Sequence, residues 1–226
     1  GATSVALDNL TVEVAGEYQS LGGKSIATDF ETPINEEEWY IGSAKNEAFE
    51  NSGCYVEDGK LVFMNANDGS MISSVEKYSN FEFSFDLLYI EKEGQEDEEG
   101  NMIRNVSYFP GVLYGLENAS DFFTGRMIYP QNTTIDILNT LYEDGTTRKW
   151  VVGAENMYDP MYDGKVITFV LTAIDGTVTF SLINKTDNLP MVSIQLYNQD
   201  TYGHVSIQTT YCGNFDIDNV RLVNLD

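Results

Sequence analysis

One short stretch of the chain repeats a pairing of aromatic and acidic side chains. It reads "ENMYDPMYDGK" and runs from Glu155 to Lys165, with a proline at its centre. A proline-fixed loop that carries two Tyr-Asp pairs can form the polar-aromatic rim of a binding site. With a tryptophan on the hairpin arm just upstream, the predicted binding set is Trp150, Tyr158, Asp159, Tyr162 and Asp163. The alternative is that these tyrosines pack against the edge of the fold.

Nucleophilic catalysis and a Cys/His zinc site have little support. The chain has one histidine, His204, so a Ser-His-Asp or Cys-His arrangement would have to use it as the base. It lies in the strand-like run "GHVSIQT", which predicts a hydrogen-bonded or surface histidine rather than a catalytic one. Cys54 and Cys212 form no CxxC pair, which argues against a zinc site. Free thiols and, for an exported protein, a disulfide both stay open.

The composition restricts the partners. Thirty-six acidic residues against twelve basic ones give a formal net charge of −24. Such a chain is repelled by nucleic acid and by anionic membrane surfaces, and it attracts cations. No stretch has the length and apolar character of a transmembrane helix, and no signal peptide is visible. We therefore expect neither nucleic-acid binding nor membrane insertion.

The elements that must position these residues are strands. The runs at 60–66 and 81–90 alternate or are continuously apolar, and paired runs flank Asp144-Gly145 and Asp175-Gly176. Asp-Gly permits positive φ at the turn centre, which is a strong hairpin signal. No long segment has a helical period. The sequence predicts an all-β protein, a two-sheet antiparallel β-sandwich.

Two segments depart from the strand pattern. "INEEEWY", from Ile34 to Tyr40, predicts a single helical turn at most. "EKEGQEDEEGN", from Glu91 to Asn101, is a charged insert between two strands, and its spacing fits no EF-hand loop. We expect a solvated loop there.

The two ends of the chain carry motifs that resemble a known family. "TDFETP" precedes Trp39 near the start, and "YGHVSIQTTYCGNFDIDNVRL" closes the chain. This combination resembles the concanavalin A-like lectin/glucanase superfamily, including laminin G-type and MAM-like bacterial jelly rolls. The resemblance implies a concanavalin A-like jelly roll whose first and last strands lie side by side. The family's glucanase pattern of Glu-x-Asp-x-Glu is missing, which counts against that enzyme class.

The same resemblance implies a cation between the two ends. Calcium takes six to eight oxygen ligands, and acidic residues on adjacent strands can supply them. The candidates are Asp29, Glu31, Asp216 and Asp218, around a structural Ca²⁺. The alternative is that Asp218 and Asn219 only hydrogen-bond a loop backbone.

The first residues repeat the closing motif. "SVALDNLTVEV", residues 4–14, resembles "NFDIDNVRLVNLD", residues 214–226. It is either the last strand of an upstream repeat or an extra strand of this domain. We therefore divide the chain into an N-terminal strand, 1–16, and a jelly-roll domain, 17–226. An apolar strand must pair somewhere, so residues 4–14 are expected to dock on this sandwich or exchange into a neighbour.

These observations lead to three hypotheses about function. The first is a non-catalytic module of an extracellular or cell-surface protein, bacterial by its resemblance, that binds a glycan or a surface protein. The second is a glycosidase on the same fold, and the third is a structural spacer. The fold hosts all three, so whether the protein is an enzyme stays open.

Overall fold

The structure is a computed structural model. It describes residues 22–43, 53–64, 70–88, 95–96, 102–103, 110–120, 125–130, 134–139, 147–151, 164–209 and 216–226. The proposed N-terminal strand, 1–16, lies outside these residues. The domain division and the pairing of residues 4–14 therefore stay predictions.

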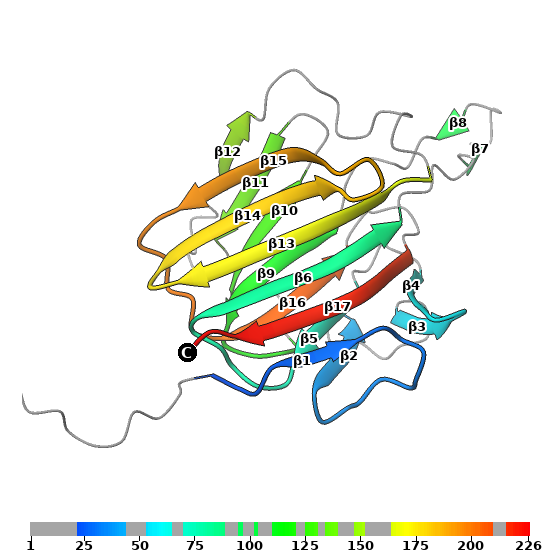
Figure 1. The fold of residues 1–226 in the computed structure, drawn as a ribbon, viewed down its shortest axis with the longest axis horizontal. Helices are drawn as coiled ribbons and strands as arrows, with labels where there is room; N and C mark the ends of the chain where they lie inside the picture. The colour runs from blue at the N-terminus through cyan, green and yellow to red at the C-terminus, as the bar shows by residue number, and fades with distance from the viewer. Residues whose placement is uncertain are drawn as a thin grey trace, which may run out of the picture.

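Two antiparallel sheets lie face to face (Figure 1). The eight-stranded sheet has the order β15 (Leu189–Leu196), β14 (Thr177–Asn184), β13 (Val166–Ile174), β6 (Phe81–Leu88), β17 (Asp216–Asn224), β4 (Lys60–Met64) and β3 (Gly53–Glu57), and β1 (Ile26–Thr28) also pairs with β17. The seven-stranded sheet has the order β12 (Thr147–Val151), β11 (Thr134–Asn139), β10 (Arg126–Pro130), β9 (Gly111–Leu116), β16 (His204–Thr209), β5 (Ser70–Ser74) and β2 (Trp39–Ser43). The predicted all-β, two-sheet antiparallel sandwich is confirmed.

The hairpins follow from their turn residues, including the one predicted around Asp175-Gly176. Asp58-Gly59 joins β3 to β4 with φ of 50° and 69°, and Asp175-Gly176 joins β13 to β14 with φ of 49° and 73°. Positive φ at both central residues matches the right-handed twist of the flanking strands. The strands on either side of Asp144-Gly145, β11 and β12, also pair, although the turn itself is outside the described residues.

The core lies between the sheets and is built from strands in which buried residues alternate with more exposed ones. In β6 the residues Phe81, Phe83 and Phe85 are all buried, while the residues between Phe81 and Phe85 are only partly so. Phe85 stacks on Phe169 with ring centroids 4.6 Å apart, and Phe169 meets Phe180 edge-on at 6.0 Å. Because successive strand residues face opposite sides, the residues between these phenylalanines point away from the core.

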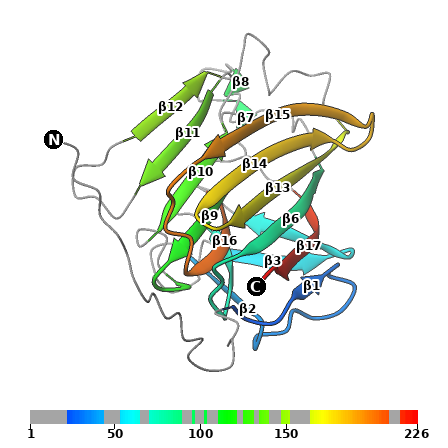
Figure 2. The ribbon, with the colours of Figure 1, turned by 60° about the vertical axis from the view of Figure 1, so that its left-hand side comes forward.

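The two ends of the described chain meet, as the resemblance implied. Thr28 pairs with Val220 and Ile26 with Leu222, so β1 lies beside β17. Figure 2 shows the C-terminus next to these two strands. The register of β17 against β6 shifts between Asp218 and Arg221, where Asn219 has a φ of 52°.

Two smaller expectations can also be compared with the structure. The single turn within Ile34–Tyr40 is confirmed, because the N–H groups of Glu38 and Trp39 both donate to the carbonyl of Asn35.

The charged insert 91–101 is not loop throughout, since β7 (Gln95–Glu96) pairs with β8 (Met102–Ile103). The short ladder satisfies backbone groups that a loop would leave to water.

Candidate functional site

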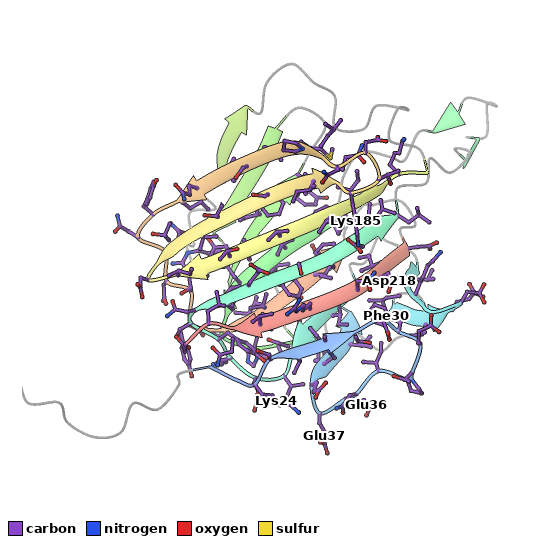
Figure 3. All side chains as sticks on the ribbon, viewed as in Figure 1. Lys24, Phe30, Glu36, Glu37, Lys185 and Asp218 are labelled. Carbon is purple, nitrogen blue, oxygen red and sulfur yellow. The ribbon has the colours of Figure 1, made fainter. Side chains whose placement is uncertain are left out.

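A pocket of about 320 Å³ opens on the outer face of the eight-stranded sheet, where β6, β13, β17 and the β14–β15 turn meet. Figure 3 shows Lys185 reaching from that turn across β13 towards β6, with Asp218 on β17 nearby. We call it the Asp86 pocket, and its lining residues are Lys60, Asp86, Leu88, Val166, Lys185, Thr186, Asp216, Asp218 and Asn219.

Asp86 organises this pocket. It occupies an outward position of β6, directly opposite Thr168 on one neighbouring strand and Asp218 on the other. Its Oδ1 accepts a hydrogen bond from Thr168 Oγ1 at 2.6 Å, and its Oδ2 accepts from Lys185 Nζ at 2.6 Å and Asn219 Nδ2 at 3.0 Å. Asp86 is only 6% exposed. A carboxylate this buried requires such partners, because desolvation penalises an unpaired charge.

The turn that carries Lys185 is itself held in place. Lys185 N–H donates to the carbonyl of Val166 at 2.8 Å, and Val166 N–H donates to Thr186 Oγ1 at 2.8 Å. Asp187 accepts hydrogen bonds from the side chains of Lys165 and Asn184, and the Lys165 bond lowers the pKa of the Asp187 carboxyl below its ordinary value. The ammonium of Lys185 is thus supported on a turn tied to the start of β13.

The two carboxylates from β17 complete the polar rim. Asp216 Oδ2 lies 3.7 Å from Lys60 Nζ. Asp218 Oδ1 accepts the N–H of Asn219 at 2.6 Å, and within the described part of the chain Asp218 pairs with no lysine or arginine. This is the backbone hydrogen bond that the sequence left open as the alternative to a metal. The pocket therefore holds acceptors, donors and, at Leu88 and Val166, an apolar wall.

The other two predicted ligands point elsewhere. Asp29 Oδ1 accepts the N–H of Glu31 at 3.2 Å. The Glu31 carboxylate lies over the β3–β4 turn, so a Cβ at Gly59 would sit 2.6 Å from Glu31 Oε1. Asp216 and Asp218 line the Asp86 pocket, whereas Glu31 lines a different one. Across the described ranges, no group of three His, Cys, Asp or Glu side chains could hold a metal ion.

That second pocket, of about 950 Å³, lies between the β1–β2 connection and the β3–β4 hairpin. We call it the Trp39 pocket, and its lining residues are Phe30, Glu31, Thr32, Pro33, Ile34, Glu36, Trp39, Tyr40, Ile41, Val56, Gly59 and Val75. Trp39 and Phe30 are each 1% exposed. Phe30 has a φ of 58°, a left-handed conformation that is unusual for a bulky residue.

The predicted aromatic binding set is largely untested. Tyr158, Asp159, Tyr162 and Asp163 lie outside the described residues. Trp150 belongs to β12, opposite Ile135, but its side chain is not described. The sequence missed Asp86 and Lys185. The one available signal was an aspartate at an outward position of the otherwise apolar run "FEFSFDLL".

His204 has a structural role, as its strand position predicted. Its Nδ1 lies 3.0 Å from the carbonyl oxygen of Ser74 on the neighbouring strand. Burial lowers the pKa of His204 below its ordinary value, and the Ser74 contact partly offsets this. Within the residues that the structure describes, no helix is long and apolar enough to cross a membrane.

Comparisons with known proteins identify the fold. No protein-family model matches the sequence, and no curated protein matches it either. Among solved structures, the chain is similar to the metal-free form of lectin I-B4 from Griffonia simplicifolia, with a TM-score of 0.58, 11% identity and coverage of 88% of this chain and 98% of the lectin.

Two further solved structures are similar to this chain over most of its length. The winged bean acidic lectin complexed with methyl-α-D-galactose gives a TM-score of 0.55 at 11% identity, covering 88% of this chain and 97% of the lectin. The VIP36 exoplasmic/lumenal domain in its Ca²⁺/Man3GlcNAc-bound form gives 0.55 at 11% identity, covering 88% of each chain. The chain has the concanavalin A-like lectin fold that its end motifs implied.

Proposed function

We propose that this protein is a non-catalytic carbohydrate-binding module of an extracellular or cell-surface protein. The observation that carries the proposal is the Asp86 pocket, which combines hydrogen-bond acceptors, donors and an apolar wall on a lectin-like sandwich. The similarity to carbohydrate-bound lectins supports the ligand class, and the extracellular and bacterial setting rests on the resemblance of the end motifs.

The pocket's chemistry suits a sugar. Each sugar hydroxyl both donates and accepts a hydrogen bond, so a site needs both kinds of group close together. Asp216 and Asp218 can accept, while Lys60 and Asn219 can donate. Leu88 and Val166 provide an apolar surface for the C–H face of the ring. A volume of about 320 Å³ is at the small end of ligand sites, which fits one or two sugar units.

The predicted Tyr-Asp loop is adjacent to this pocket along the chain. Asp163 precedes Val166, a lining residue, by three positions in the sequence. Three residues span at most about 11 Å of extended chain. This adjacency supports a role for Tyr158, Asp159, Tyr162 and Asp163 as further contacts. Trp150 belongs to the seven-stranded sheet and stays a separate prediction.

Glycan-array binding of the purified chain tests the proposal. Asp218→Asn removes the carboxylate with no cationic partner in the described part of the chain, and we expect it to weaken binding about tenfold, the cost of a lost charged hydrogen bond. Asp58→Asn is the matched control, because Asp58 is exposed, lines neither pocket and sits at a φ of 50° that asparagine tolerates. Failure to bind any glycan, or equal loss in both variants, overturns the proposal.

A glycosidase is the second candidate, and one observation favours it. Asp86 and Asp218 are directly opposite each other on paired strands, where Cβ atoms lie about 4.5–5.5 Å apart. Retaining glycosidases hold two carboxyl groups about 5–5.5 Å apart. Against this, both oxygens of Asp86 already accept hydrogen bonds. Turnover of a polysaccharide that is lost in Asp218→Asn would replace the binding-module proposal with this one.

The calcium prediction rests on the resemblance alone. Asp216 and Asp218 line one pocket, Glu31 lines the other and Asp29 lines neither. In this arrangement the four predicted ligands do not fit one shared ion, and no part of the proposed function depends on it. From this placement we expect an unchanged melting temperature in excess EDTA. A fall that added Ca²⁺ reverses would show that the chain holds a stabilising ion and would restore the calcium prediction.

A further inference from the structure

We propose that the Asp86 pocket is one end of a longer binding surface, and that its ligand is an uncharged, linear oligosaccharide of several sugar units. The sugar chain continues from the pocket along the outer face of β13, β14 and β15 to Tyr197. This proposal rests on the proposed function and adds the length and the charge of the ligand. We call the surface the β13–β15 face, and its central residues are Val170, Thr172, Thr179, Ser181, Ser193 and Gln195.

These six side chains form two rows across the three strands. Val170, Ser181 and Ser193 are directly opposite one another and form the first row, and the other three form the second row in the same way. Their neighbours along each strand are buried in the core or packed against it, so the six side chains point outwards. Figure 1 looks onto this face, and no labelled strand crosses in front of it. The face is therefore open to a ligand.

The face carries no charge, although charged residues make up 21% of the chain. Between Val166 and Asn184 only Asp175 is charged, and it lies in the β13–β14 turn. The last strand in the order of the sheet, β15, has no charged residue at all. Strands at a sheet edge normally carry charges, because these discourage pairing with other chains. An uncharged face costs less to desolvate than a charged one, so this composition favours a ligand that covers it.

The groups on this face match those of a sugar chain. Ser181 Oγ donates to Ser193 Oγ at 2.9 Å, and Gln195 Nε2 donates to Thr179 Oγ1 at 3.3 Å. Each hydroxyl has one donor and two acceptor positions, so these side chains can also bond sugar hydroxyls, and Val170 offers an apolar contact to ring C–H groups. Protein interfaces are instead depleted in serine and enriched in aromatic residues and arginine, which favours a glycan over a protein here.

The face begins at the Asp86 pocket, which is an observation independent of its composition. Thr168 lies on the same side of β13 as Val170, and its hydroxyl donates to Asp86 Oδ1 at 2.6 Å. Val166, the first outward residue of β13, lines the pocket itself. Figure 3 shows Lys185 at this end of β13. The pocket and the face are therefore continuous along one strand.

Tyr197 lies at the other end of the face. It directly follows β15, it is 63% exposed, and its hydroxyl donates to Gln195 Oε1 at 2.7 Å, which holds the ring beside the second row. An exposed aromatic ring offers an apolar surface with a polar tip. From Val166 to Ile174, β13 extends about 26 Å at about 3.3 Å per residue. A sugar chain that covers this distance is several units long.

The test compares sugar chains of different length on one glycan array. It carries two to six units of β-1,4-linked glucose, xylose and mannose and of α-1,4-linked glucose, with oligogalacturonides as the charged counterpart. We expect six units of at least one uncharged chain to bind at least about tenfold more tightly than two units, because more groups are in contact. Equal binding of two and six units, tightest binding of the galacturonides, or no binding of any uncharged chain overturns the proposal.

Matched lysine variants locate the contact. Thr179→Lys and Ser193→Lys each place a long charged side chain on the face and outside the Asp86 pocket. We expect both to remove the advantage of six units over two, and to leave the binding of two units within about twofold. Tyr197→Ala should weaken the binding of six units by about fivefold. Val56→Lys is the control, because it adds the same side chain on β3 at the far edge of the same sheet. An equal loss in Val56→Lys would reduce the effect to general charge and reject the face.

The other occupant to exclude is a second copy of this chain. We expect sedimentation to give the same mass for the wild-type chain and for Ser193→Lys. A change from dimer to monomer in Ser193→Lys would show that copies of the chain cover this face, and it would overturn the proposal. Unchanged binding of six units in both lysine variants overturns this inference alone, whereas failure to bind any glycan overturns the proposed function as well.

Discussion

Two pockets in the described part of this protein differ in how their acidic side chains are paired. In the Asp86 pocket, two of the three carboxylates are matched by lysines, Asp86 by Lys185 and Asp216 by Lys60, while Asp218 accepts the backbone N–H of Asn219. In the Trp39 pocket, Glu31 and Glu36 face an apolar cavity without a cationic partner among the described residues. A chain with a net charge of −24 holds both arrangements within one sandwich.

The net charge of the chain therefore does not determine which kind of ligand a given pocket favours. A pocket whose charges are mostly paired presents donors and acceptors in fixed positions, which suits a neutral polyhydroxyl ligand. A pocket whose carboxylates have no cationic partner disfavours anions and attracts cations. Position in the fold, rather than the number of acidic residues, separates the two cases.

The largest effect is expected from breaking the pairing in the Asp86 pocket. Asp86→Ala removes an acceptor of three hydrogen bonds from a buried site, and we expect a loss of about 3 kcal/mol in the free energy of unfolding. Glu82→Ala, on the same strand and the same face, should cost within about 0.5 kcal/mol. Urea denaturation measures both. A difference below about 1 kcal/mol would mean that Asp86 does not organise the site.

The next effect tests the wall of the Trp39 pocket. Gly59→Ala places a methyl group 2.6 Å from Glu31 Oε1 at a φ of 69°. Because this oxygen is the end of a flexible side chain and can shift, we expect a cost of about 1.5 kcal/mol, most of it backbone strain. Gly164 has almost the same φ, 68°, with nothing within 4 Å, so Gly164→Ala isolates the backbone strain, about 1 kcal/mol. Thermal melts of both variants give the comparison. Equal costs would show that Glu31 moves aside freely.

Alkaline pH should lower the stability of the fold through Tyr78. Burial raises the pKa of Tyr78 to about 12, and its hydroxyl donates to the carbonyl of Lys24, just before β1. The unfolded chain loses this proton near pH 10, whereas the folded chain holds it, so stability should fall as the pH rises from about 10 to 12. Melts across this range should show a smaller fall in Tyr78→Phe. The exposed Tyr202→Phe is the control, and an equal fall in both variants would contradict the assignment.

Salt should produce the smallest effect. Raising the ionic strength from about 10 mM to 1 M shortens the Debye length from about 30 to 3 Å. We expect glycan binding in the Asp86 pocket to change less than about twofold, because a neutral sugar is held by hydrogen bonds rather than by attraction between charges. Calorimetry at both salt concentrations measures this, and a several-fold change would mean that the bound ligand carries a charge.

Much of the fold was readable from local sequence. Asp58-Gly59 and Asp175-Gly176 specify their hairpins through residues that tolerate positive φ, and the alternation in Phe81–Leu88 specifies which side chains enter the core. The resemblance of the end motifs correctly implied that β1 and β17 pair. The candidate site was harder to predict from the sequence. Asp216 and Asp218 were singled out as calcium ligands, yet they line a pocket with Lys60 and Lys185.

The sequence by itself determined that this protein is an acidic, two-sheet antiparallel sandwich, because strand alternation and turn chemistry act over a few neighbouring residues. Only the tertiary structure decided which acidic residues are neutralised. Asp86 meets Lys185 across 99 positions and Asn219 across 133, and no local pattern encodes such contacts. The register between β6, β13 and β17 brings them together, and that register depends on how the whole core packs.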